Sequence, residues 1–204
     1  MQLNKPDYYN NLDNIYLKIW DLLNIGLKDR NESFHIPVFI CGEKKNFDGR
    51  IVVLRGVDKN KKNIFFHSDI RSNKIKILKK NPQATLLFYN KKEKIQLRVF
   101  GKINIHYKNY FTEKSWIKTA HMGRQCYLGK NSPGSDSLIP TSGLTEMIDN
   151  SKYSIQESEI GYKNFCVIET IVQTIEWLYL AQKGHRRAFF KLKNDHVEKK
   201  WLIP

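Results

Sequence analysis

Long apolar runs are missing from this sequence of 204 residues. No stretch of about 18 consecutive apolar residues occurs, so the sequence predicts no membrane-spanning helix. The first residues, 1–14, also lack the apolar core of a signal peptide. We therefore expect a soluble, cytoplasmic protein that has no membrane partner.

Cysteine is scarce as well. The three cysteines, Cys41, Cys126 and Cys166, form no CxxC pair, and the sequence has no HExxH motif. An odd count without paired spacing gives no disulfide framework and no zinc signature. This pattern is typical of a protein in a reducing compartment, and we expect no metal site.

Acidic residues are few beside the basic ones. The chain has 20 Asp and Glu against 35 Lys and Arg, a formal net charge of +15. Such an excess favours nucleic acid, an anionic membrane surface or a phosphorylated ligand as partner. The lysines, however, are scattered along the sequence, and Asn and Ile are also abundant, as in proteins from AT-rich genomes. We therefore expect a solvated basic surface, and nucleic-acid binding is the less favoured interpretation.

Several motifs of well-known enzyme classes are also absent. The sequence has no P-loop, no GxGxxG motif after a strand and no nucleophile elbow. Nucleotide hydrolysis, dinucleotide binding of the Rossmann type and serine hydrolase chemistry therefore have no support, and no catalytic side chain can be assigned.

Short apolar segments joined by polar links dominate the chain instead. The expected strands cover residues 35–42, 50–58, 63–69, 83–89, 94–107, 165–181 and 186–192. Closely spaced strands with polar hairpin loops predict an antiparallel sheet or barrel rather than a parallel sheet with crossover helices. The length suits a single domain, residues 1–204, that is mainly β with peripheral helices.

Four helices are expected between and before these strands. An apolar period near 3.6 predicts the first over 12–27, with Asp13 as its cap and Gly26 at its end. The other three are expected at 71–82, at 110–122 and near 143–150. Residues 128–143 are rich in Pro, Gly and Ser and predict a long loop.

A phosphate site is suggested by basic and hydroxyl side chains at element starts. Arg50 begins a strand, and Ser72, Asn73 and Lys74 form the first turn of the helix expected after 63–69. A helix N-terminus offers free N–H groups and partial positive charge, so hydroxyl and cationic groups there favour a phosphate dianion. The alternative is an ordinary serine cap beside a surface lysine.

Two further candidates stand on later strands. Gln96 lies among apolar residues, where its amide could hydrogen-bond the carbonyl or ring nitrogen of a heterocycle. Trp177 and Arg187 flank one turn and offer a flat apolar plate and a planar donor fork. The alternatives are a solvent-facing Gln, a core Trp and a surface Arg.

Taken together, these segments resemble the pyridoxamine 5'-phosphate oxidase family. The segments that carry the resemblance are RIVVLRGVD (50–58), FFHSDIRSNK (65–74), NPQATLLFY (81–89), IQLRVFG (95–101), EWLYLAQKGHRRAFF (176–190) and the terminal WLIP (201–204). The resemblance covers about residues 35–107 and 165–204, more than half of the chain. The resemblance implies an FMN-binding split β-barrel, an antiparallel Greek-key barrel, and a homodimer with FMN at the interface.

The resemblance also implies which residues bind the flavin. The cofactor-binding set is Arg50, Ile51, Val52, Val53, Leu54, Arg55, His67, Ser68, Ser72, Asn73, Lys74, Gln96, Trp177 and Arg187. Within it, Arg50 and Lys74 would bind the FMN phosphate with support from Ser72. The strand after Arg50 would run beside the isoalloxazine ring, and Trp177 and Arg187 would reach the flavin from the second subunit.

The part of the family pattern that recognises vitamin B6 is less complete. Asn73 and Arg55 replace an Arg and a Lys of the oxidases. The candidates for contact with an anionic substrate are Arg124, Tyr127, Lys183 and His185.

Three functions from different classes follow. The resemblance implies an FMN-dependent oxidoreductase similar to pyridoxamine/pyridoxine 5'-phosphate oxidase. The second is a non-catalytic flavin-binding or sensor protein. The third and less favoured is a basic nucleic-acid-binding β-barrel.

Overall fold

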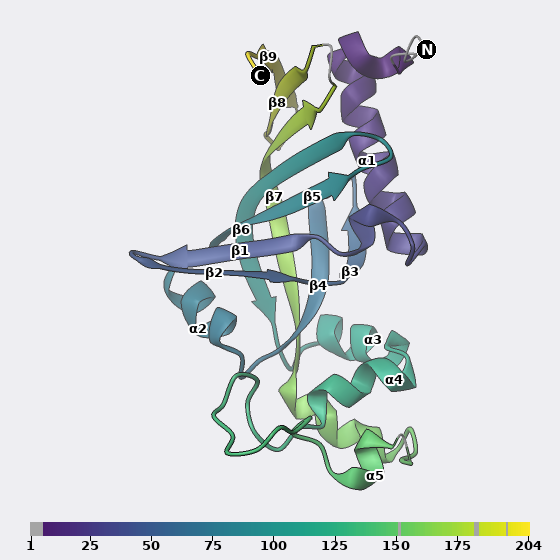
Figure 1. The fold of residues 1–204 in the computed structure, drawn as a ribbon, viewed down its shortest axis with the longest axis vertical. Helices are drawn as coiled ribbons and strands as arrows, with labels where there is room; N and C mark the ends of the chain where they lie inside the picture. The colour runs from purple at the N-terminus through teal and green to yellow at the C-terminus, as the bar shows by residue number, and fades with distance from the viewer. Residues whose placement is uncertain (1–5, 151, 182–183, 195) are drawn as a thin grey trace.

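The computed structural model of the chain describes residues 6–150, 152–181, 184–194 and 196–204. Nine strands of this part form one antiparallel sheet, with helices beside it and below it (Figure 1). The strands are β1 (Val38–Glu43), β2 (Asn46–Ile51), β3 (Leu54–Asp58), β4 (Asn63–Asp69), β5 (Gln83–Asn90), β6 (Ile95–His106), β7 (Phe165–Tyr179), β8 (Arg186–Leu192) and β9 (Val197–Leu202).

The helices are mostly short. The α-helices are α1 (Leu12–Lys28), α2 (Asn73–Lys80), α3 (Tyr110–Lys118), α4 (His121–Arg124) and α5 (Glu146–Asp149). The 3-10 helices are η1 (Asp7–Asn10), η2 (Ser33–His35), η3 (Gln125–Tyr127) and η4 (Glu157–Asn164). No helix in the described ranges is long and apolar enough to cross a bilayer.

The order of the strands confirms the predicted fold class. They follow one another as β2-β1-β5-β6-β7-β4-β3, and β8 and β9 continue the sheet from β7. Every pair is antiparallel. β2 and β3 stand at opposite ends of this order, and no pairing between them is present among the described strands. The sheet is therefore mainly antiparallel and curved, but it is not closed.

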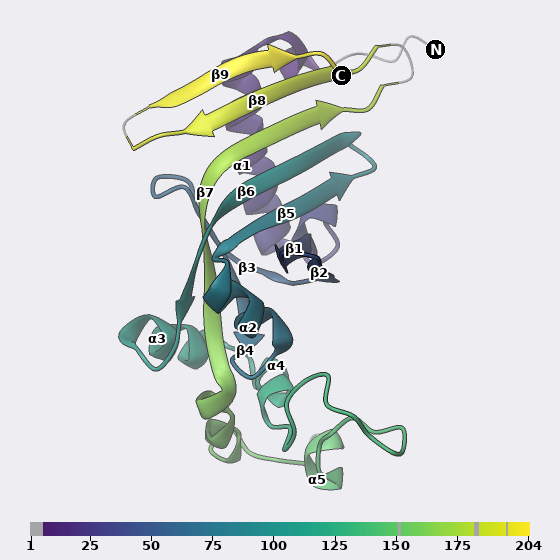
Figure 2. The ribbon, with the colours of Figure 1, turned by 90° about the vertical axis from the view of Figure 1, so that its left-hand side faces the viewer.

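The longest strand, β7, joins the two halves of the molecule. Its 15 residues pair with β6, β4 and β8, and Figure 2 shows it curving from the upper sheet down to the lower helices. The register between β6 and β7 shifts at a bulge, because Phe100 pairs with Thr174 and Gly101 with Val172, which leaves Gln173 of β7 without a register partner on β6. A side chain at Gly101 would collide with the carbonyl oxygen of Ile171, so this position requires glycine.

The first helix covers the inner face of the sheet (Figures 1 and 2). Ile15, Ile19, Trp20 and Leu23 are fully buried in the main core, which confirms the amphipathic helix predicted from the apolar period. Burying four large apolar side chains contributes on the order of 6–12 kcal/mol before entropy is subtracted. α1 is therefore held by tertiary packing rather than by its own propensity.

The predicted range 12–27 agrees with α1 to within one residue, but the predicted cap and the predicted role of Gly26 were wrong. The cap is Asn11, whose side-chain oxygen accepts from the N–H groups of Asp13 and Asn14, each at 2.9 Å. Gly26 does not terminate the helix, which continues to Lys28. A Cβ at Gly26 would lie 2.7 Å from the backbone carbon of Phe34, so glycine is needed here for close packing against η2.

The strand predicted over 50–58 is two strands. β2 ends at Ile51, and β3 begins at Leu54 and pairs with β4 instead of β1. The chain changes partner at Val52, whose N–H donates to the carbonyl of Pro37 at 2.9 Å. A continuous apolar run does not reveal such a change of partner. The last strand, β9, was also missed, because its lysines interrupt the apolar pattern.

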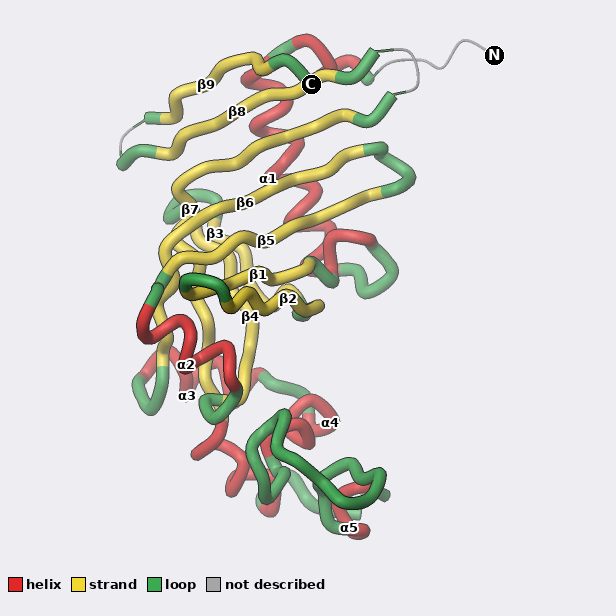
Figure 3. Tube along the Cα trace, turned by 60° about the vertical axis from the view of Figure 1, so that its left-hand side comes forward, coloured by secondary structure: helices red, strands yellow, loops and turns green. Residues whose placement is uncertain are grey.

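A lower lobe is built from α3, α4, α5, η3, η4 and the loop 128–143 (Figure 3). Trp116, Tyr127, Phe165 and Val167 form a second small core there. The helix predicted over 110–122 is interrupted, since α3 ends at Lys118 and α4 follows.

Candidate functional site

The most unusual buried group is the ammonium of Lys74, whose residue is only 8% exposed. Its Nζ donates to the hydroxyl oxygens of Ser68 (2.9 Å) and Ser72 (3.1 Å). Lys74 is drawn inward because the helix around it buries Ile75 and Leu78 against the sheet. The lysine thus lies where α2 begins, next to the end of β4.

Arg50 brings a second cation to this site from β2. Burial lowers the pKa of Lys74, and the positive charge of Arg50 lowers it further. Arg50 itself is held by Asp48, with Nε donating to Oδ1 at 3.1 Å. In the described ranges, no carboxylate accepts a hydrogen bond from the Lys74 ammonium. The fold therefore brings Arg50, Ser72 and Lys74 of the predicted phosphate site into one cluster and adds Ser68 to it.

The hydroxyl of Ser72 serves this cluster rather than the helix. Ser72 is the N-cap residue of α2, but its side chain makes no capping hydrogen bond. It lies 3.4 Å from the hydroxyl of Ser68 and is 1% exposed. Asn73, by contrast, is exposed. The hydroxyl of Ser72 is thus committed to the polar cluster around the Lys74 ammonium and not to the N-terminus of α2.

Two thiols border the site, which the sequence did not reveal. The Sγ of Cys166 donates to the carbonyl of Ser68 at 3.2 Å, and burial raises its pKa to about 12. Burial also raises the pKa of Cys41. Both groups therefore stay neutral thiols near neutral pH and do not neutralise Lys74. No sequence signal marks them, because neither belongs to a spaced motif.

The segment expected beside the flavin ring alternates between two sides. Ile51 and Arg55 are exposed, Val53 is half-buried, and Val52 and Leu54 are buried. The outward residues are thus the ones free to meet a ligand, and the buried ones fix the strand in the core.

Arg55 has two neighbours that define its surroundings. Burial, with help from the charge of Arg55, lowers the pKa of His67 to about 4. The imidazole is therefore neutral at pH 7 and packs edge-on against Phe165 at 4.8 Å. The charge of Arg55 also acts on the hydroxyl of Tyr127. Arg55 is thus an exposed cation beside a neutral imidazole and a phenol.

The prediction that Arg124 binds substrate is contradicted by its contacts. Arg124 is 4% exposed and lies over the ring of Trp116 at 4.6 Å. Its guanidinium donates to the carbonyls of Trp116 (3.1 Å) and Thr119 (3.2 Å), to Ser158 (3.2 Å), and to the carboxylate of Glu159. Every part of the fork is occupied, so Arg124 holds the lower lobe together.

Tyr127 is also a structural residue. It is 7% exposed and meets Trp116 and Phe165 edge-on, at 5.8 and 5.0 Å between ring centroids. Burial raises the pKa of its hydroxyl. The ring belongs to the small core of the lower lobe, which the sequence could not show because the loop around it has no periodic pattern.

Trp177 and Arg187 do not form the expected pair within the chain. Trp177 is 1% exposed and faces the main core, stacked on Tyr179. Its register partner on β8 is Ala188, whereas Arg187 lies opposite Leu178. Adjacent residues of a strand point to opposite faces, so Trp177 and Arg187 are separated by the sheet. Trp177 cannot reach a second subunit from the core, and this part of the prediction is corrected.

A row of side chains crosses the outer face instead. Tyr89, Gln96, Leu178 and Arg187 are successive register partners on β5, β6, β7 and β8. In the next row, Glu176 accepts from Arg187, with Nε at 2.9 Å and Nη2 at 2.8 Å, and also pairs with Arg98. Those two arginines lower the pKa of Glu176 although its burial opposes this. Gln96 and Arg187 thus share one face, and no helix of the described residues lies over it (Figure 2).

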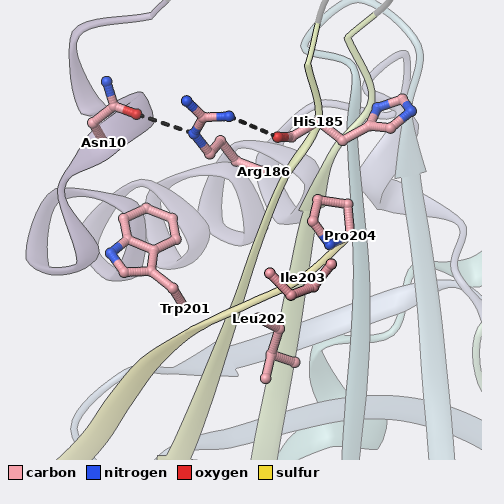
Figure 4. Close-up of a pocket in the computed structure, with 7 residues that line it drawn as sticks. All are labelled: Asn10, His185, Arg186, Trp201, Leu202, Ile203 and Pro204. Atoms are coloured by element: carbon pink, nitrogen blue, oxygen red, sulfur yellow. Dashed lines mark hydrogen bonds between the residues drawn. The ribbon is translucent and has the colours of Figure 1, made fainter.

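His185 lies away from the lysine site, and Lys183 lies outside the described residues. A hollow of about 410 Å³ is lined by Asn10, His185, Arg186 and the C-terminal residues 201–204. Figure 4 shows Arg186 between Asn10 and the carbonyl of His185, at 3.3 and 3.0 Å. The Nδ1 of His185 accepts from the N–H of Ala181 at 3.1 Å, which directs the ring away from the hollow.

A further arginine, missed from the sequence, ties the long loop to the lysine site. Arg71 is paired with Asp69 at 2.7 Å. Its Nη1 also donates to the carbonyls of Gly129 (3.0 Å) and Lys130 (3.1 Å). The loop 128–143 is thereby anchored one residue before Ser72.

Comparison of the sequence with known proteins supports the predicted family resemblance. Residues 29–107 match the family described as "Pyridoxamine 5'-phosphate oxidase, FMN-binding domain". The chain is 25% identical over 194 residues to pyridoxine/pyridoxamine 5'-phosphate oxidase 2 of Arabidopsis thaliana, covering 89% of this chain and 93% of the plant protein.

Solved structures share the fold. A pyridoxamine 5'-phosphate oxidase-related, FMN-binding protein from Nostoc punctiforme superposes with a TM-score of 0.73 at 14% identity, covering 99% of this chain and all of that one. PhzG from Burkholderia lata, in complex with tetrahydrophenazine-1-carboxylic acid, gives a TM-score of 0.71 at 14% identity, covering 100% and 99%. The predicted resemblance and the split-barrel fold are therefore confirmed.

Proposed function

We propose, from this likeness to the pyridoxamine 5'-phosphate oxidase-like family, that the chain binds FMN and uses it as an oxidoreductase. The observation that carries the proposal is the Lys74 ammonium, buried among hydroxyls with Arg50 beside it and no carboxylate hydrogen-bonded to it in the described structure. Such a group favours a dianionic ligand that can be held by both cations and both serines.

The cluster favours a dianion for an electrostatic reason. The carboxylate of Asp69 acts on the Lys74 ammonium from a distance, but it is itself paired with Arg71. A buried charge without a hydrogen-bonded counter-charge is costly, and a bound phosphate removes most of this cost. Charge-assisted hydrogen bonds to phosphate contribute about 1.5–3 kcal/mol each. Arg50, Ser68, Ser72 and Lys74 would hold the phosphate of FMN, and the exposed side of the strand from Ile51 would border the ring.

We also propose a homodimer. Gln96 and Arg187 lie on a sheet face that no described helix covers. Two apolar side chains, the half-exposed Tyr89 and Leu178, lie in the same row, so this face has apolar surface for a partner to bury. Antiparallel sheets usually cover one face and leave the other to solvent or a partner. A second copy of the chain packed on this face would bring Arg187 of one subunit close to the surface of the other subunit.

When bound, the flavin would accept a hydride from the substrate and pass the electrons to an electron acceptor. The chain supplies placement and charge: Arg55 is the exposed cation best placed to hold a small anionic substrate, with neutral His67 beside it. Pyridoxamine or pyridoxine phosphate is the leading candidate, because the plant relative carries that name.

A second candidate is a flavin-binding protein without vitamin B6 oxidation. The observation that favours it is the burial of Arg124 and Tyr127, because neither is free to grip a substrate. Turnover with the phosphorylated vitamer separates the two candidates.

The test begins with the absorbance of the purified protein near 450 nm, roughly where flavins absorb. Lys74→Gln should lose the bound flavin, whereas Lys76→Gln, an exposed lysine on the same helix, should keep it. Anaerobic bleaching by pyridoxamine phosphate supports the oxidase. Bleaching only by a nicotinamide donor supports a reductase, and no bleaching by either supports the non-catalytic candidate. A colourless protein that does not bind added FMN would refute the proposal.

A further inference from the structure

Two turns that are far apart in the sequence meet at one end of the sheet. The Nζ of Lys62, in the turn between β3 and β4, donates to the carbonyls of Lys193 and Asn194 after β8, the latter at 3.1 Å. The N–H of Val172 donates to the carbonyl of Lys62 at 2.9 Å and ties the first turn to β7. Figure 2 shows the β3–β4 turn and this end of β8 on the same side of the molecule.

This contact gathers lysines that look scattered in the sequence. The two-turn lysine surface consists of Lys59, Lys61, Lys62, Lys191, Lys193 and Lys200. The carboxylates that the sequence supplies to these segments are Asp58, Asp195 and Glu198, of which Glu198 pairs with Lys193. The surface therefore has an excess of positive charge, and Lys59 and Lys61 are exposed at its outer turn.

An aromatic ring lies among these lysines. Phe189, Lys191 and Lys200 line a hollow of about 370 Å³ together with Thr174, Glu198 and Lys199. The Nζ of Lys200 lies 5.4 Å from the centroid of the Phe189 ring, its register partner. Lysines that follow a phosphate backbone, with an aromatic ring between them for a base, are the elements of single-strand recognition.

We propose that the two-turn lysine surface binds single-stranded nucleic acid, with lysines on phosphates and Phe189 against a base. A membrane surface fits less well. None of the exposed large apolar residues falls within the described parts of 54–63 or 189–200. Stable binding to a bilayer usually adds apolar side chains that enter it. Phe189 and Lys200 continue the row of Arg98 and Glu176 on the outer face of the sheet, so the proposed homodimer has to leave this end of β8 and β9 uncovered. The nucleic-acid surface shares no residue with the proposed phosphate site.

The experiment measures anisotropy of a labelled 16-nucleotide oligomer with the full-length protein over a salt series. Contacts to three or four phosphates give a slope of log K against log salt of about −2 to −3. The triple variant Lys61→Glu, Lys191→Glu, Lys200→Glu should lose at least about tenfold in affinity and flatten this slope. Phe189→Leu should weaken binding about five- to hundredfold.

The matched control reverses three exposed lysines elsewhere: Lys45→Glu, Lys76→Glu and Lys92→Glu. It changes the net charge equally but leaves the surface intact, so it should bind nearly as the unchanged protein. Flavin content, measured in every variant, should not change. Equal losses of oligomer affinity in both triple variants would overturn the proposal. Binding to anionic vesicles that depends on the two-turn lysine surface, without binding of the oligomer, would also overturn it.

Discussion

Replacing Lys74 by methionine should stabilise the protein without FMN and weaken its affinity for FMN. Methionine keeps the length of the aliphatic stem but removes the buried charge. Ser68 and Ser72 keep each other as partners at 3.4 Å, so the change leaves no new orphaned hydroxyl. Replacing a buried charge by an apolar group typically gains about 1–3 kcal/mol, or about 3–9 °C in Tm for a chain of this size.

The same change removes a charge-assisted hydrogen bond to the phosphate. Its loss of about 1.5–3 kcal/mol corresponds to about a 10- to 150-fold weaker Kd for FMN. The assays are urea denaturation of the flavin-free protein and quenching of FMN fluorescence on titration. Lys76→Met, exposed on the same helix, should change either quantity little.

The pH dependence gives an independent check. The folded state lowers the pKa of Lys74, so its penalty is fully present below the folded pKa. It fades as the pH rises towards 10.5, where the unfolded lysine also loses its proton. The stability gain of Lys74→Met should therefore shrink in alkaline solution. A destabilised flavin-free variant with unchanged FMN affinity would refute the reasoning.

Three further predictions concern residues whose roles the structure defines. Burial lowers the pKa of His67 from 6.5 to about 4 in the folded state, so acidification across that range should cost up to about 3 kcal/mol of unfolding free energy. The variant His67→Phe should lose this pH dependence in denaturation curves. Arg124→Ala should cost about 2–4 kcal/mol of unfolding free energy yet leave the Kd for FMN unchanged. If the variant instead shows a raised KM and unchanged stability, Arg124 binds substrate after all. Trp177→Ala should cost about 3–5 kcal/mol by leaving a core cavity, whereas Leu178→Ala, on the outer face, should cost much less, and similar losses by calorimetry would contradict this assignment.

Local pattern predicted most strands because their apolar residues lie in short, separate groups. The strands over 63–69 and 186–192 have the predicted bounds, since polar turns flank them on both sides. The change of partner at Val52 was not predictable, because it depends on where β3 and β4 pair. β9 escaped because it is an edge strand with charged residues along it.

The phosphate cluster was predictable in composition but not in its details. Ser72 and Lys74 stand at the start of α2 as predicted, whereas Arg50, expected to begin a strand, lies near the end of β2. The resemblance supplied their common purpose. The burial of Lys74 depends on how the whole of α2 packs against the sheet, so the residue types alone could not predict it. Trp177 could have been assigned to the core, since Ile175 and Tyr179 show which side of β7 is apolar. The burial of Arg124 could not be predicted, because it depends on Ser158 and Glu159, which lie in a segment distant in the sequence.

The position of β7 in the sheet has a consequence for synthesis on the ribosome. β4 and β6 are both synthesised before their partner β7, which follows the first 164 residues of the chain, and β8 is synthesised after it. Until then β4 and β6 expose unpaired edges, and the contacts that join them have large sequence separations. We expect the nascent chain to fold late, to need protection from aggregation, and to respond to changes in the rate at which its last forty residues are translated.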